Sequence, residues 1–133
     1  MGAPVATQTA QVVAVDTHIV LVPTPGGPVP TPLPHPFSGQ IQGATASTVF
    51  VGGKPVAVKD SVAINSPPHL PTPPGASFQA PPKNQGKVLV TSMTVFAGGK
   101  GVARIGDTVT TCNDPADAPV GMIVAAPGTV FAG

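Results

Sequence analysis

The feature that most constrains this 133-residue chain is a segment that it repeats. The run TVFVGGKPVAV begins at Thr48, and TVFAGGKGVAR begins at Thr94. A third copy is divided between the chain ends, with GAPVAT from Gly2 matching the second half of the repeat and GTVFAG, up to Gly133, matching the first half. If the copies are equivalent in space, the two ends must pair to complete the third unit. The repeat therefore predicts a closed body with pseudo-threefold symmetry.

Each copy has the pattern of a β-hairpin. Two adjacent glycines separate short β-branched and apolar runs, as in a tight two-residue turn. An Asp followed by Ser or Thr comes next, at Asp60, at Asp107 and, in the split copy, at Asp16. We expect these carboxylates to cap turns. The copies differ by one residue before this Asp, which predicts a bulge or a shortened turn.

Nineteen prolines and sixteen glycines would suggest disorder in a chain without a pattern. The repeat, the low charged fraction of 8% and the supply of Val and Thr argue for a folded chain instead. Strong helix formers are sparse, so we expect mainly β structure with little or no helix and with paired terminal strands. The Pro-rich connections, 23–36 and 66–82, are expected to be extended and polyproline-like, with low-complexity linkers as the simpler interpretation. One domain should cover residues 1–133, with units at roughly 43–69 and 87–114 and a third divided between 2–22 and 127–133.

Composition also excludes several classes of function. A net charge of +1, with six scattered Lys and Arg, gives no basic stripe for nucleic acid. The longest apolar run, 12–22, contains Asp16 and His18 and is shorter than the roughly 20 residues that cross a bilayer. The N-terminus does not have the pattern of a signal peptide. A single Cys cannot form an internal disulfide, and the sequence has neither a phosphate-binding loop nor a nucleophile motif, so we do not expect an enzyme.

Four metal-binding side chains are spread along the chain: His18, His35, His69 and Cys112. Scattered histidines are more often surface residues, but His35 and His69 stand among prolines, which fix the direction of the imidazole. Three imidazoles and one thiolate form a complete tetrahedral set for zinc, and a site closed in this way is structural. We therefore expect one zinc ion, with iron as the less favoured metal. In a body with threefold closure the ends of the three units converge, so distant residues can meet and a metal can replace an apolar core.

The repeat resembles the PAAR-repeat proteins, which are named after a Pro-Ala-Ala-Arg motif. Residues 101–104 read Gly-Val-Ala-Arg, with Gly in place of Pro and Val in place of the first Ala. Residues 55–58 and 4–7 keep the Pro but lack the Arg. Each motif is degenerate, yet the threefold set spans most of the chain.

The resemblance implies a small conical fold of short hairpins, one copy of which caps the trimeric VgrG-type spike of a contractile injection system. That system would be a type VI secretion system, an extracellular injection particle or a phage-like tail. The expected function is a metal-sharpened tip that punctures a membrane, which it contacts only transiently, and that can carry effector or toxin cargo. The resemblance also implies a zinc ion near the point, a role that His18, His35, His69 and Cys112 match in residue type.

Such a tip would be made in the bacterial cytoplasm without a signal peptide and delivered outside the cell or into the target. With no sequence outside the repeats, we expect a tip without a fused toxin domain. The alternative function is a small metal-dependent hydrolase or metal-binding module, in which the three histidines hold a catalytic zinc and Cys112 takes no part.

The base of such a cone must expose apolar residues that the spike covers. The candidates are the repeated positions Val49, Phe50, Val95, Phe96, Val130 and Phe131. Plain core packing is the other interpretation of these six residues and the slightly favoured one. Phe37 and Phe78, in the connections, are expected to pack locally.

Overall fold

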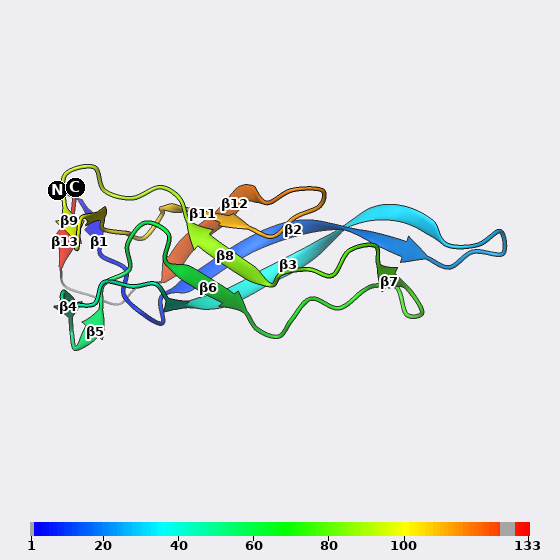
Figure 1. The fold of residues 1–133 in the computed structure, drawn as a ribbon, viewed down its shortest axis with the longest axis horizontal. Helices are drawn as coiled ribbons and strands as arrows, with labels where there is room; N and C mark the ends of the chain where they lie inside the picture. The colour runs from blue at the N-terminus through cyan, green and yellow to red at the C-terminus, as the bar shows by residue number, and fades with distance from the viewer. Residues whose placement is uncertain (1, 126–129) are drawn as a thin grey trace.

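The computed structural model describes residues 2–125 and 130–133, and these contain strands and turns but no helix. The mainly β class predicted from the sequence is therefore confirmed for the described residues. Figure 1 shows an elongated molecule with both termini at one end and a long hairpin at the other, narrower end. The strands are β1 (Ala3–Pro4), β2 (Gln11–Val22), β3 (Val29–Gly43), β4 (Phe50–Val51), β5 (Lys54–Pro55), β6 (Val62–Asn65), β7 (Ser77–Phe78), β8 (Gln85–Val88), β9 (Phe96–Ala97), β10 (Lys100–Gly101), β11 (Thr108–Thr111), β12 (Ala118–Ala125) and β13 (Phe131–Ala132).

A closed barrel of six strands forms the middle of the molecule. The strand order is β12-β11-β8-β6-β3-β2, and β2 also pairs with β12, which closes the ring. Every pairing in the ring is antiparallel. The barrel therefore consists of three hairpins, β2–β3, β6–β8 and β11–β12, each of which follows one short repeat unit in the chain.

Three short hairpins form the end that carries the termini: β4–β5, β9–β10 and β1–β13. The last of these joins the two chain ends, with Ala3 opposite Ala132 and Pro4 opposite Phe131. The predicted pairing of the terminal strands is therefore confirmed. Residues 127–129, which the prediction also included, lie outside the described residues.

Backbone hydrogen bonds join the three repeats in a ring. Ala6 N–H donates to Ala103 O at 2.8 Å, Ala103 N–H to Ala57 O at 2.9 Å, and Ala57 N–H to Ala6 O at 2.9 Å. All three alanines are fully buried, and isolated bridges between neighbouring residues follow the same cyclic order. Each repeat thus supplies one donor and one acceptor to its neighbours, so the three backbones approach one another as closely as strands in a sheet.

The turn that leaves each repeat is the same length in all three, so the predicted bulge or shortened turn is wrong. Ala10 N–H bonds to Thr7 O, Ser61 N–H to Val58 O, and Asp107 N–H to Arg104 O. The third turn residues, Thr9, Asp60 and Gly106, all have positive φ. Asp60 therefore corresponds to Gly106, and Ser61 corresponds to Asp107.

The prediction that the three Asp side chains cap turns holds only for Asp107. Its Oδ2 accepts a bond from Arg104 N–H at 2.8 Å, as Ser61 Oγ does from Val58 N–H at 2.9 Å. The exposed Asp60 instead lies 3.7 Å from Lys100 Nζ. Asp16 lies in the middle of β2, away from any turn.

The first Pro-rich connection is not a polyproline linker, because most of it belongs to β3, which pairs residue by residue with β2 from Gln40 to Val29. Thr17 and Ile19 N–H bond to Asn113 and Asp114, on the side of β2 away from β3. The residues of β3 opposite Thr17 and Ile19 are Pro34 and Pro32. In an antiparallel ladder the backbone N and C=O of these two prolines therefore point away from β2. Alternating prolines therefore remove donors only from the outer edge of β3, and the ladder to β2 stays intact.

Two groups of buried apolar residues stabilise the fold. One fills the barrel and includes Val12, Phe37, Ile41, Val109 and Ile123. The other lies among the short hairpins and includes Val5, Val56, Val58, Val102 and Ala132. Among the described residues there is no helix that is long and apolar enough to cross a lipid bilayer.

Candidate metal centre

A cluster of buried polar side chains lies at the end of the barrel core that faces away from the short hairpins. Asp16 and His18 come from β2, His35 from β3 and His69 from the β6–β8 connection, and Cys112 directly follows β11. All five residues are buried. Each of the three barrel hairpins contributes at least one of them, so the cluster links the whole circumference of the barrel.

Strand geometry explains how β2 and β3 position three of these side chains. Asp16 and His18 are two residues apart, which places both on the inner face of β2. Asp16 is directly opposite His35 in the ladder. His35 is therefore a cross-strand neighbour of Asp16, and the ring centroids of His18 and His35 are 5.5 Å apart.

The outer nitrogen of each imidazole faces a polar group, and hydrogen bonds orient the rings of His35 and His69. His35 Nδ1 lies 3.0 Å from Leu33 O, so this nitrogen carries the proton and donates it. His69 Nδ1 lies 3.3 Å from Asn65 Nδ2. His18 Nδ1 lies 3.4 Å from Asp114 Oδ2, without forming a hydrogen bond.

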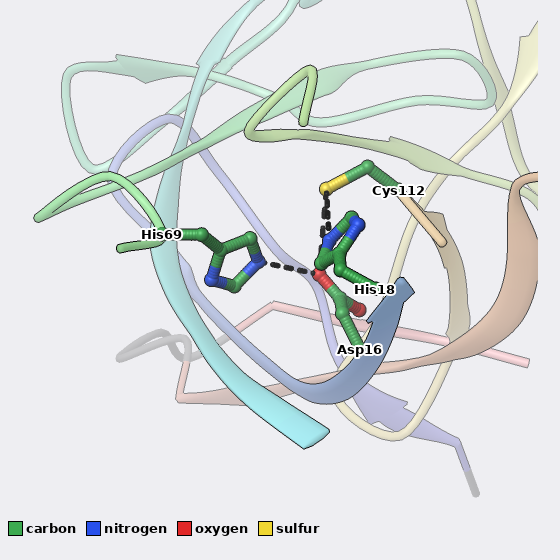
Figure 2. A group of neighbouring side chains, drawn as sticks. All are labelled: Asp16, His18, His69 and Cys112. Carbon is green, nitrogen blue, oxygen red and sulfur yellow. Dashed lines mark hydrogen bonds and ion pairs between the residues drawn. The ribbon is translucent and has the colours of Figure 1, made fainter. Parts of the chain in front are cut away.

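The inner atoms converge, as Figure 2 shows for four of the residues. Asp16 Oδ2 lies 2.9 Å from His69 Nε2 and 3.4 Å from Cys112 Sγ, and Cys112 Sγ lies 3.7 Å from His18 Nε2. One potential ligand atom from each of Asp16, His18, His69 and Cys112 lies within 4.8 Å of the others. This buried set of two His, one Cys and one Asp can hold a metal ion such as zinc.

His35 lies against this group, with its ring centroid 5.6 Å from that of His69. Because its Nδ1 donates to Leu33, its Nε2 presents a lone pair. This Nε2 and His18 Nδ1 are buried without a hydrogen-bond partner among the described residues. An unpaired buried polar atom is costly, and for His35 Nε2 a metal ion would satisfy it.

The electrostatic surroundings of Cys112 disfavour a free thiolate nucleophile. Burial, together with the neighbouring Asp16 carboxylate, raises the pKa of Cys112 to about 11. The arrangement of a catalytic thiol, base and carboxylate is matched by Cys112, His18 and Asp114. The thiol nevertheless stays protonated at neutral pH unless a cation lowers its pKa. Burial also lowers the pKa of His35, which keeps this imidazole neutral and able to bind a metal.

Of the four residues that the sequence singled out, the structure brings the ligand atoms of His18, His69 and Cys112 together and adds Asp16. The fourth, His35, lies beside this group, with its ring centroid 5.5 Å from that of His18. Sequence reasoning had assigned Asp16 to a turn because it precedes a Thr, as Asp107 does. The signal that was missed is its spacing of two residues from His18 on a strand, which places both side chains on one face. Phe78 packs on the outer side of the cluster, 5.7 Å from the His18 ring and 5.3 Å from the His35 ring.

The chain matches no protein-family model, and no curated protein matches it.

The cluster does not lie at the extreme end of the molecule. Beyond His18, four more residue pairs extend the β2–β3 hairpin, from Ile19 opposite Pro32 to Val22 opposite Val29. Figure 1 shows this hairpin as the narrow end, with β7 beside it. The buried cluster therefore lies where the barrel ends and the projecting hairpin begins.

The six repeated Val and Phe residues are at the opposite end of the molecule. Phe50, Phe96 and Phe131 are 56%, 59% and 58% exposed, and the Val before each of them is also exposed. The interpretation of these residues as core is therefore wrong. The core at this end is instead formed by the residues of the cyclic contact, such as Val56 and Val102.

Proposed function

We propose that this protein is a PAAR-type conical tip that caps the trimeric VgrG-type spike of a contractile injection system. The three short hairpins are its base and the projecting β2–β3 hairpin is its point. A bound zinc ion ties the three barrel hairpins together just below that point. The tip punctures the target membrane, contacts it only during delivery and can carry effector cargo.

The observation that carries this proposal is the threefold set of exposed phenylalanines. Three equivalent residues, on hairpins that are bonded in a ring, are exposed to nearly the same extent. Exposed apolar patches of this kind mark interaction surfaces. A face with internal pseudo-threefold symmetry can meet a true trimer with three equivalent contacts, so one copy satisfies all three subunits.

The metal centre supports the same proposal. Ligands from three separate hairpins would cross-link a narrow part of the body in which a large apolar core has no room. A bound dication would also offset the negative charges of Asp16 and of the Cys112 thiolate. Zinc suits a mixed set of imidazole, thiolate and carboxylate ligands.

A metal-dependent hydrolase is the weaker candidate, because it assigns no role to Cys112. The structure places Cys112 Sγ within 3.7 Å of His18 Nε2, inside the set of potential ligands. X-ray absorption of the zinc-loaded protein should show one sulfur ligand and no water. A coordinated water without sulfur would favour the hydrolase.

The spike-binding proposal is tested by replacing Phe50, Phe96 and Phe131 with Ser in one variant. Binding to a trimeric VgrG-type spike protein is then measured by analytical ultracentrifugation. Because the three rings are more than half exposed, we expect a folded variant with a similar melting temperature but without spike binding.

A matched control replaces three exposed apolar residues on the barrel wall, Val15, Val120 and Met122, with Ser. This variant should bind the spike as the unchanged protein does. Loss of binding in the control, or retained binding in the Phe variant, would contradict the assignment of the base.

A further inference from the structure

A pocket of about 500 Å³ adjoins the candidate metal centre on one side. His18 and Cys112 form part of its lining, together with segments 80–83 and 113–117. It thus reaches two of the potential ligands directly, although both side chains are almost inaccessible to solvent. A second pocket, of about 290 Å³, reaches only His69 of the cluster.

The lining of the larger pocket favours a cation. It contains the carboxylates of Asp114 and Asp117 and the ammonium of Lys83. Asp114 Oδ2 lies 3.4 Å from the buried His18 Nδ1, which has no hydrogen-bond partner in the described part of the chain. A carboxylate therefore lies next to a potential ligand residue on the pocket side. The lining of the smaller pocket has no carboxylate.

The two walls of the larger pocket differ in how firmly they are held. Segment 113–117 is bonded to β2, because Asp114 N–H donates to Thr17 O and both Asn113 and Asp114 accept bonds from backbone N–H groups of β2. Segment 80–83 reads Ala-Pro-Pro-Lys and lies outside the strands, so it can move without breaking the barrel. Lys83 Nζ lies 3.3 Å from Asp117 Oδ2 and joins the two walls.

We propose that this pocket is the route by which a divalent metal ion reaches and leaves the buried centre, and that the Lys83–Asp117 pair holds the route closed. Asp114 and Asp117 attract the cation, and movement of segment 80–83 admits it to His18 and Cys112. The inference rests on the proposed metal centre. These residues control the rate at which the metal ion exchanges and not the affinity of the centre for it.

The first test narrows the route with the substitution Ala116→Trp, at an exposed position on the firmly held wall. Uptake of Zn²⁺ by the chelator-treated protein and its release to excess chelator are followed by stopped flow. A side chain that obstructs the route raises the barrier equally in both directions. We expect both rates to fall about tenfold, which corresponds to about 1.4 kcal/mol in the barrier, with an unchanged Kd.

The matched control is Leu70→Trp, an exposed residue that lines the smaller pocket beside His69. This variant should exchange Zn²⁺ at the rate of the unchanged protein. Slower exchange in Leu70→Trp with normal exchange in Ala116→Trp would assign the route to the smaller pocket and overturn the proposal.

The second test opens the route with Lys83→Met. An exposed ion pair contributes up to about 1 kcal/mol, so we expect uptake and release to become up to about fivefold faster, again at constant Kd. The control is Lys100→Met, which removes the exposed pair with Asp60 near the base and should leave both rates unchanged.

Zinc binding tests the metal centre, and the exchange rates of the pocket variants test the route. If the protein binds no Zn²⁺, the proposed metal centre fails. If it binds Zn²⁺ and both pocket variants exchange at the unchanged rate, only the route is wrong. A change in Kd that accounts for the whole change in release rate would also contradict it, because the pocket would then be part of the binding site.

Discussion

At the scale of single residues, the chemistry of the centre depends on Cys112. Its thiol is buried beside Asp16, and its pKa is raised to about 11. A thiol in such surroundings ionises when a bound cation compensates the charge, so a metal at this centre would displace the proton of Cys112. The same burial therefore disfavours a free thiolate at neutral pH.

The first prediction concerns the substitution Cys112→Ser. A metal present at a hundredfold excess over its Kd stabilises a fold by about 2.7 kcal/mol. For a domain of this size about 1 kcal/mol corresponds to about 4 °C in melting temperature. We expect the variant to retain less than one zinc per chain and, in the presence of zinc, to melt about 10 °C below the unchanged protein.

After chelation the two proteins should melt at similar temperatures, because Ser and Cys are alike in size. Metal content is measured by mass spectrometry and melting by calorimetry. Equal zinc content and equal melting temperatures with zinc would show that the thiol is not a ligand.

The second prediction concerns pH and His35. Burial lowers the pKa of His35 below its usual 6.5, although the bond to Leu33 O partly opposes the shift. Below about pH 6.5 the unfolded chain therefore binds a proton at this residue that the folded chain does not. The free energy of unfolding consequently decreases as the pH is lowered. The metal-free protein should lose stability between pH 7.5 and 5.5 in urea titrations.

His35→Gln removes this titration and should show a smaller loss over the same range. For each protein the free energy of unfolding at pH 5.5 is subtracted from that at pH 7.5. A destabilisation by the substitution that is the same at both pH values then cancels. Parallel losses in the two proteins would exclude His35 as a source of the pH dependence.

At the scale of elements, the sequence predicted the short hairpins correctly because the Gly-Gly turns mark them. It did not predict that β3 would be the longest strand, since proline usually argues against strands. The strand forms because Pro30, Pro32, Pro34 and Pro36 alternate, which leaves every second residue free to donate to β2. The predicted ligands also carried no local spacing signal, because they converge only when three hairpins close one barrel.

The alternating prolines have a further consequence for the projecting hairpin. An exposed edge with free donors invites pairing with another chain, and proline blocks it. The third prediction is that Pro30→Thr and Pro32→Thr, combined, restore two donors on this edge and cause self-association at concentrations at which the unchanged protein is monomeric. Light scattering after size-exclusion chromatography measures the mass.

Pro28→Thr is the control, because Pro28 precedes β3 and is not paired in the ladder. It should stay monomeric. If the double variant is also monomeric, the prolines of β3 do not protect this edge.

At the scale of the whole molecule, pseudo-threefold symmetry holds at the end with the short hairpins and is lost at the other end. The three repeats are similar in sequence and form a ring of backbone hydrogen bonds at the base through Ala6, Ala57 and Ala103. One exposed Phe from each repeat lies at the same end. The connections between them differ in length and composition, so the other end has no repeated surface and instead combines unlike side chains in one buried cluster. The sequence predicted the pairing of the termini because a split repeat can be completed in no other way.

The central claim is that one copy of this chain, with one bound metal ion, caps one spike trimer. Native mass spectrometry of the zinc-loaded protein mixed with a trimeric VgrG-type spike protein measures this directly. The fourth prediction is a single complex whose mass equals three spike subunits, one copy of this chain and one zinc ion. A complex with three copies per trimer, or no complex between the folded, zinc-loaded protein and an intact trimer, would contradict the account.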